Sequence, residues 1–214
     1  MIVEVPVKGY FAENCFFYID DQTKHGFIID PGAQAQGLLE LIRDNGWIIE
    51  KILLTHGHFD HIGAVDELRS ALDIPVMAYK TSDAYLLDAR RNLSALCGPA
   101  ILVKNVTYVT DGDMIHLEAN PAFSLRVLYT PGHTTDSVVF YSQQDRVAFV
   151  GDTIFKGSIG NYQYPGGNLR DIQRSILDRI FTLPDQTMIC SGHSEQTTVG
   201  AEKRRYISST TPPN

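Results

Sequence analysis

The segment "THGHFDHIG", residues 55–63, holds three histidines and one aspartate within six consecutive positions: His56, His58, Asp60 and His61. The density is unusual because the whole chain of 214 residues has only seven histidines. Side chains alternate in direction along an extended loop, so the first two histidines can reach the same ion. The aspartate and the third histidine follow a turn and are offset toward a second position. Imidazole and carboxylate groups bind Zn²⁺, Fe²⁺ and Mn²⁺ well, so the segment predicts a metal site.

Three further candidate ligands stand where apolar strands are expected to end. They are His133 in "LYTPGHT", Asp152 in "VAFVGDT" and His193 in "MICSGH". Functional side chains of layered α/β proteins tend to lie on loops at strand ends, so we expect these residues to share one rim with residues 56–61. His25 and His116 have no ligand neighbours in the sequence, and we expect both to be structural.

The pattern of apolar runs and turn residues predicts a mixed α and β fold. Two sheet-rich halves that each carry helices suggest a four-layer αββα sandwich of the α/β (α+β) class. We expect a single domain over residues 1–207 and a disordered, polar, Pro-rich tail over 208–214. For residues 92–105 a flexible flap is one interpretation. The expected strands are 2–7, 15–19, 26–30, 48–56, 74–79, 106–109, 114–117, 123–129, 137–142, 146–150 and 187–191, and the expected helices are 34–45, one from about 60, 81–91, 168–182 and 199–207.

Composition excludes several classes of protein. The net charge of −7 and the absence of a basic arm argue against nucleic acid as a partner. The basic run 203–205 is typical of a solvated helix face. Cys15, Cys97 and Cys190 are widely spaced, which argues against a disulfide scaffold or a zinc ribbon. The sequence shows neither a signal peptide nor an apolar stretch of about eighteen residues, so we expect a cytoplasmic protein without a membrane partner.

Five pieces of the chain resemble the metallo-β-lactamase superfamily, and within it the short, single-domain glyoxalase II-like (hydroxyacylglutathione hydrolase-like) enzymes. The pieces are "THGHFDHIG", "TPGHT", "GDTIF", "SIG…PGGN" and "SGH…TTVG", with "NCFFYI" and "IIDPGA" agreeing upstream. The resemblance implies a site for two divalent metal ions between two sheets, with zinc expected and iron or manganese as alternatives. The implied ligands are His56, His58 and His133 for the first ion, Asp60, His61 and His193 for the second, and Asp152 as the bridge.

The same resemblance implies a thioesterase in which a metal-bridging hydroxide attacks the carbonyl of a small-molecule thioester. Asp60 is then expected to orient the hydroxide as well. Our hypothesis for Asp30, at the end of the strand "GFIID", is that it accepts a hydrogen bond from a ligating imidazole. A glutathione conjugate is the leading substrate. Substrate-pocket candidates are Lys156, Asn161, Tyr162 and Tyr164, and the oligomeric state stays open.

Departures from the family pattern keep other functions open. Asn161 stands where the glutathione-dependent members carry a basic residue, and Ser194-Glu195 replaces the usual Gly-Pro after the last histidine. Full-length glyoxalase II continues into a C-terminal helical extension, whereas this sequence ends soon after "GHSEQTTVGAEKRRY". The main rival is a persulfide dioxygenase that holds one iron through the equivalents of His56, His133 and Asp152. A metal-dependent esterase or lactonase is a further alternative. A metal-free binding module is disfavoured because no ligand position is missing.

Overall fold

The first of two large sheets gathers the N-terminal strands. The computed structural model describes residues 1–210. Strands β1 to β3 pair antiparallel as a meander, whereas β3 to β6 run parallel, with helices in the connections. The strand order is β1-β2-β3-β4-β5-β6. The strands are β1 (Ile2–Lys8), β2 (Ala12–Ile19), β3 (His25–Ile29), β4 (Ile48–Leu53), β5 (Val76–Tyr79) and β6 (Thr107–Val109).

The second large sheet contains the C-terminal strands in the order β14-β13-β10-β9-β8-β7. All of its pairs are antiparallel except β10 with β13, which run parallel. A small hairpin, β11 (Ile154–Phe155) with β12 (Ser158–Ile159), projects after β10. The other strands are β7 (Met114–His116), β8 (Ser124–Tyr129), β9 (Val138–Ser142), β10 (Val147–Gly151), β13 (Met188–Ser191) and β14 (Thr197–Thr198).

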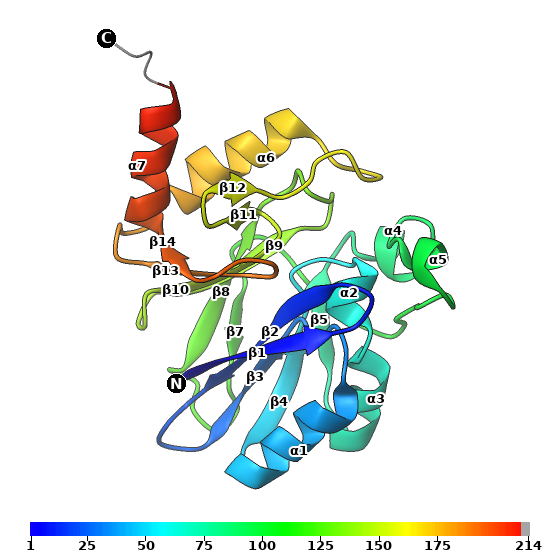
Figure 1. The fold of residues 1–214 in the computed structure, drawn as a ribbon. Helices are drawn as coiled ribbons and strands as arrows, with labels where there is room; N and C mark the ends of the chain where they lie inside the picture. Colours follow the sequence, from blue (N-terminus) through cyan, green and yellow to red (C-terminus); the bar gives the residue numbers. More distant parts are fainter. Residues whose placement is uncertain (211–214) are drawn as a thin grey trace.

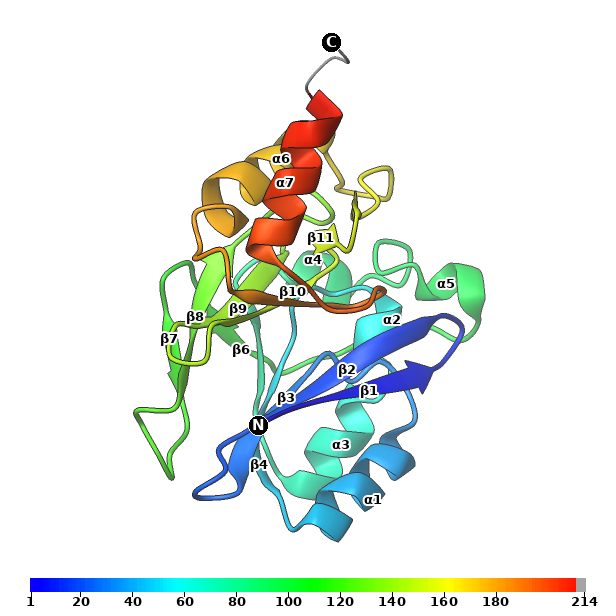
Figure 2. The ribbon, with the colours of Figure 1, turned by 60° about the vertical axis from the view of Figure 1, so that its left-hand side comes forward.

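Helices cover the outer face of each sheet, so the molecule has the expected four αββα layers (Figures 1 and 2). The first sheet packs against α1 (Ala35–Asn45) and α3 (Val65–Leu72). The second packs against α6 (Leu169–Ser175), its π-helical continuation η1 (Ile176–Ile180) and the start of α7 (Val199–Thr210). Among the helices of residues 1–210, none combines the length and apolarity that crossing a lipid bilayer requires.

Alternation along β2 shows how the sequence builds these layers. Phe16 and Tyr18 belong to the core between the two sheets, whereas Phe17 and Ile19 belong to the core beneath the helices. Successive side chains of a strand point to opposite faces, so a continuous apolar run fits a strand that is covered on both sides. Phe149 of β10 meets Phe16 across the central layer, with ring centroids 5.5 Å apart.

Several sequence expectations need correction. The helix expected over 81–91 is only one turn, α4 (Asp83–Leu86), because Tyr85 is fixed by hydrogen bonds to Pro165 and Thr135. Residues 92–105 contain the short helix α5 (Ser94–Cys97), and the buried Asn92 ties this segment down. Residues 208–210, expected in the tail, continue α7, and 211–214 lie outside the described residues.

Candidate metal centre

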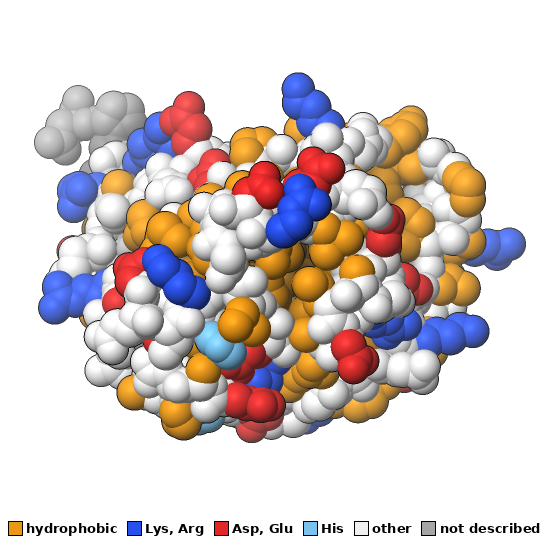
Figure 3. Space-filling view, turned by 90° about the horizontal axis from the view of Figure 1, so that it is seen from below, with side chains coloured by type: hydrophobic (Ala, Val, Ile, Leu, Met, Phe, Trp, Pro, Cys, Tyr) orange, Lys and Arg blue, Asp and Glu red, His pale blue; other side chains and the backbone are white. Residues whose placement is uncertain are grey.

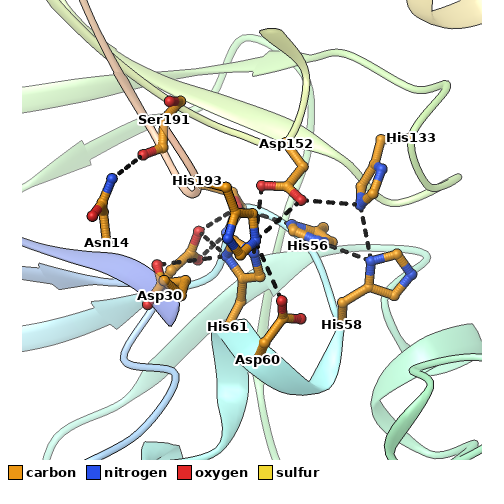
Figure 4. Close-up of polar contacts among 12 residues, drawn as sticks. Asn14, Asp30, His56, His58, Asp60, His61, His133, Asp152, Ser191 and His193 are labelled. Carbon is orange, nitrogen blue, oxygen red and sulfur yellow. Dashed lines mark hydrogen bonds and ion pairs between the residues drawn. The ribbon is translucent and has the colours of Figure 1, made fainter. Parts of the chain in front are cut away.

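The predicted ligands come from the carboxyl ends of strands in both sheets. The loop after β4 carries His56 and His58, and the one-turn helix α2 (Phe59–Ile62) carries Asp60 and His61. From the other sheet, His133 follows β8, Asp152 directly follows β10, and His193 follows β13. Figure 4 shows these seven side chains pointing toward one another between the sheets. The structure therefore brings together all the residues for which the sequence predicted a shared rim.

One group of ligand atoms contains His56, His58 and His133, all of them buried. His58 Nδ1 lies 3.1 Å from His56 Nε2 and 2.9 Å from His133 Nε2. Three ring nitrogens thus face a common point. These are the residues that the resemblance implies for the first ion.

A second group contains Asp60, His61 and His193. His193 Nε2 lies 3.3 Å from both His61 Nε2 and Asp60 Oδ2. Asp152 stands between the two groups: its Oδ2 is 3.6 Å from His133 Nε2 and 3.4 Å from His193 Nε2. The carboxylate of Asp152 thus lies within reach of both groups, which is the position that the resemblance implies for the bridge.

The outer nitrogens of four histidines are held by oxygen acceptors, as is usual for ligating imidazoles. His61 Nδ1 lies 3.0 Å from Asp30 Oδ2, and His56 Nδ1 lies 3.1 Å from the Thr55 hydroxyl, which itself bonds to Asp30. The two remaining acceptors are backbone oxygens, Asn161 O at 2.7 Å from His133 Nδ1 and Ala12 O at 2.8 Å from His193 Nδ1. A proton on each Nδ1 leaves the Nε2 lone pair directed into the cluster.

The converging lone pairs indicate that these residues fit metal ions. Neutral imidazole nitrogens that face one another about 3 Å apart repel unless a proton or a cation lies between them. Asp152 Oδ1 is also buried without a hydrogen-bond partner among the described residues. Two divalent cations would satisfy all of these atoms, so the donor set fits the metal pair.

Burial and mutual charge shift the titration of the cluster. Burial, with His133 nearby, lowers the pKa of His58 to about 3, so this imidazole is neutral and available as a ligand. Burial alone would raise the pKa of Asp152, but the neighbouring His61, His133 and His193 hold it well below its usual range. Burial likewise lowers the pKa values of His56 and His133, so the first group is neutral beside an ionised carboxylate. In the second group neighbouring carboxylates outweigh burial: Asp152 raises the pKa of His61, and Asp60 raises that of His193.

Close backbone approach explains two glycines beside the ligands. Gly151 has φ 48° directly before Asp152, and a Cβ there would lie 2.2 Å from Thr55 Oγ1. A Cβ on Gly192, directly before His193, would lie 2.6 Å from both Asp152 Oδ1 and His61 Cε1. Only glycine lets these segments approach the ligands so closely.

Three supporting residues were not predicted from the sequence. Glu13 of β2 is buried, and its Oε1 lies 3.7 Å from His61 Nδ1. Asp136 is buried against Gly57, the residue between His56 and His58 in the sequence. Burial raises the pKa of Asp136 to about 6. Asn14 donates to the backbone oxygens of Ser191 and Ser194, so it ties β2 to the loop of His193 (Figure 4). For Asn14, the sequence offered one signal, the upstream segment "NCFFYI" that agrees with the family. For Glu13 and Asp136 it offered none, because acidic residues are rarely buried and a buried position is not expected for them.

A cavity of about 310 Å³ opens beside the cluster. Asn161 and Tyr164 line it, as expected. Lys156 and Tyr162 do not, which corrects the prediction for both. The Lys156 ammonium pairs with the Glu195 carboxylate, and Tyr162 packs into the core beneath α6. The lining is Phe11, Ala12, His58, Phe59, Asp60, Leu93, His133, Asp152, Phe155, Asn161, Tyr164 and His193.

The two remaining histidines lie outside the cluster. His25 pairs with Glu50, and His116 bonds to the Pro121 backbone oxygen, so both are structural as expected. On the face in Figure 3, Lys and Arg side chains are dispersed among acidic and apolar ones without a continuous basic patch.

Comparison with known proteins places this centre in a family. The model of the metallo-beta-lactamase superfamily matches residues 9–193. The hydroxyacylglutathione hydrolase GloC of Haemophilus influenzae is 31% identical, covering 95% of this chain and 96% of its own. Two solved structures are each 34% identical over 95% of this chain: the BLEG-1 B3 metallo-beta-lactamase (97% of that chain, TM-score 0.89) and TTHA1623 in a di-iron-bound form (98%, TM-score 0.83). The chain therefore belongs to the metallo-β-lactamase superfamily of metal-dependent hydrolases.

Proposed function

We propose that this protein is a thioester hydrolase of the hydroxyacylglutathione hydrolase type that uses two divalent metal ions. The observation that carries the proposal is the pair of ligand groups joined by Asp152 at the floor of an open cavity. The likeness to GloC adds support for a thioester as the small-molecule substrate. We expect zinc or iron in the centre; the di-iron form of TTHA1623 makes iron a serious alternative.

Bound cations supply a nucleophile made from water at neutral pH and positive charge for the developing oxyanion. The chain's own residues do the rest. Asp60 lines the cavity, and its carboxylate can accept a hydrogen bond from a water beside the carbonyl carbon, which orients that water. Asp30 and Thr55 fix the rings of His61 and His56 through their outer nitrogens, so the ligand geometry exists before substrate binds.

The first test is metal content measured together with two activities. We expect about two metal ions per chain and hydrolysis of S-lactoylglutathione, with both the first ion and the activity lost in His58→Ala. His25→Ala is the matched control, because this histidine pairs with Glu50 outside the cluster and should keep metal and rate.

Two outcomes would replace the proposal. A single iron with oxygen uptake on glutathione persulfide would identify a dioxygenase. Turnover of simple esters, lactones or a β-lactam, with no thioester hydrolysed, would identify another hydrolase; the β-lactam is included because BLEG-1 is a metallo-beta-lactamase.

A further inference from the structure

A second cavity adjoins the one beside the metal centre. It also measures about 310 Å³, and it shares Phe11, Phe59 and Asp60 with the first. The two cavities therefore meet at this three-residue partition. Figure 2 shows the elements around the second cavity, the β1–β2 turn, α2 and α5, gathered on one side of the molecule. The second cavity is lined by Gly9, Tyr10, Phe11, Gly32, Ala33, Gln34, Phe59, Asp60, Gly63, Ser94, Cys97, Gly98, Pro99 and Ile101.

Aromatic and aliphatic side chains form the walls of the first cavity away from the metal ligands, and in the second cavity they alternate with glycines and a few uncharged polar residues. Phe11 packs on Phe59 with ring centroids 5.8 Å apart, and Tyr10 packs on the same ring at 6.3 Å. Leu93, Phe155 and Tyr164 continue the apolar wall in the first cavity. Ligand sites generally combine such walls with a few polar groups that fix orientation, a part that the metal centre plays here.

Neither cavity has a lysine or arginine among its lining residues. Lys156 is engaged by Glu195, and Arg205 is engaged by the buried Glu202. Away from the metal centre, a substrate group with a carboxylate would therefore lose its hydration in this groove without gaining a cationic partner, which is unfavourable.

The backbone at Leu93 gives independent support. This residue has φ 71°, a left-handed conformation that is unfavourable for leucine, yet its side chain is buried and lines the first cavity. Strain of this kind at a ligand site points to a side chain retained for binding.

Buried Asn92, directly before Leu93, holds the surrounding wall. Its backbone oxygen accepts from Phe59 N at 2.9 Å, and its side chain bonds to Ser94 N and Ile101 O at 2.9 and 2.7 Å. One residue thus fixes the partition through its backbone oxygen and both borders of the second cavity through its side chain, so the groove is formed before a ligand arrives.

We propose that the two cavities form one groove that binds an uncharged, apolar acyl group of the substrate, extending from the metal centre across Phe11 and Phe59, with Leu93 as a specificity-determining residue. The inference rests on the proposed function, because the acyl group belongs to the thioester that the centre hydrolyses. Beyond the proposed function, it specifies that the acyl half of the thioester is uncharged and apolar.

The first experiment compares hexanoyl and adipoyl thioesters of N-acetylcysteamine on the metal-loaded chain. The two acyl chains have the same length and differ only in a terminal carboxylate. We expect kcat/KM to favour hexanoyl by roughly tenfold or more. Leu93→Asn, which tolerates the left-handed backbone, should reduce the preference below about threefold, whereas the exposed Leu96→Asn should retain it. Equal rates for the two thioesters would overturn the inference.

The second experiment measures binding without turnover. Cys97 lines the second cavity and is partly exposed, while Cys15 and Cys190 are buried and serve as internal references. On the metal-loaded chain, the carboxylate of hexanoate can occupy the metal centre and its apolar tail the groove, whereas adipate would place a second carboxylate in the groove. We therefore expect hexanoate, but not adipate, to slow alkylation of Cys97 by iodoacetamide several-fold. Unchanged alkylation would overturn the extension into the second cavity.

Failure of this inference and failure of the proposed function give different results. Hydrolysis of both thioesters without preference, and no protection of Cys97, would refute the apolar acyl groove but remain consistent with a thioesterase. Protection of Cys97 by hexanoate without hydrolysis of any thioester would support the groove and refute the thioesterase function.

Discussion

Replacing Asp30 with asparagine should weaken metal binding without disturbing the backbone. Asp30 sits at φ 50°, where asparagine is well tolerated. One carboxylate oxygen accepts the Thr55 N–H at 2.7 Å, and the other accepts the Thr55 hydroxyl and His61 Nδ1. An amide must turn its NH₂ toward at least one of these donors, which loses charge-assisted hydrogen bonds worth about 1.5–3 kcal/mol each. With His61 no longer held, we expect affinity for the second ion to fall roughly 10–100-fold.

The assay is metal content by mass spectrometry after equilibration against a graded series of chelator concentrations. The variant should release one of two ions at a chelator concentration that the wild type resists. Asp20→Asn is the matched control, because Asp20 is also buried and hydrogen-bonded but accepts from Gln22, Thr23 and Asn120 outside the centre. If Asp30→Asn and Asp20→Asn retain metal equally, the role given to Asp30 is wrong.

Three further predictions concern the same region. Chelation of the metal should lower the melting temperature by at least about 5 °C, since ions at 100 times their Kd stabilise by about 2.7 kcal/mol; an unchanged value in calorimetry would contradict a built metal site. Gly192→Ala should lose metal because its Cβ would meet Asp152 and His61 at 2.6 Å, whereas Gly37→Ala, with open space around it, should keep both ions and gain about 0.5–1 kcal/mol of stability. The folded-state pKa of Asp136 is raised to about 6, so its contribution to stability is full below about pH 4 and is lost as the pH rises through 6. Urea unfolding of metal-free Asp136→Asn should therefore show a pH profile flatter by about 3 kcal/mol over this range, and parallel profiles would refute that.

The longer apolar runs in the sequence were sufficient to predict the strands and the layered architecture. Every expected strand is present within a few residues, and the αββα layers follow from apolar runs such as 15–19 that are buried on both faces. The ligand rim was predictable because His56 and the residues after it follow a strand, and because His133, Asp152 and His193 each follow a strand and a glycine, a local pattern with a fixed spatial outcome.

Very short strands and contacts between distant parts of the chain could not be predicted from the sequence pattern. The β11–β12 hairpin and β14 have only two residues in each strand, too few for periodicity to register. The helical composition of 81–91 was overridden by the contacts of Tyr85, since tertiary context routinely outweighs propensity. Burial of Glu13 and Asp136 depends on chain segments far away in sequence, so neither residue carried a readable signal.

The origin of the ligands in both sheets has a consequence for biosynthesis. Each ligand group draws side chains from the first half of the chain and at least one from the second. The group with Asp60 and His61 also needs His193, which lies more than 130 residues further along the chain. A ribosome must therefore translate the chain beyond residue 193, and release β13 from its exit tunnel, before that group exists. An ion that binds this group would consequently be loaded only after both sheets have docked.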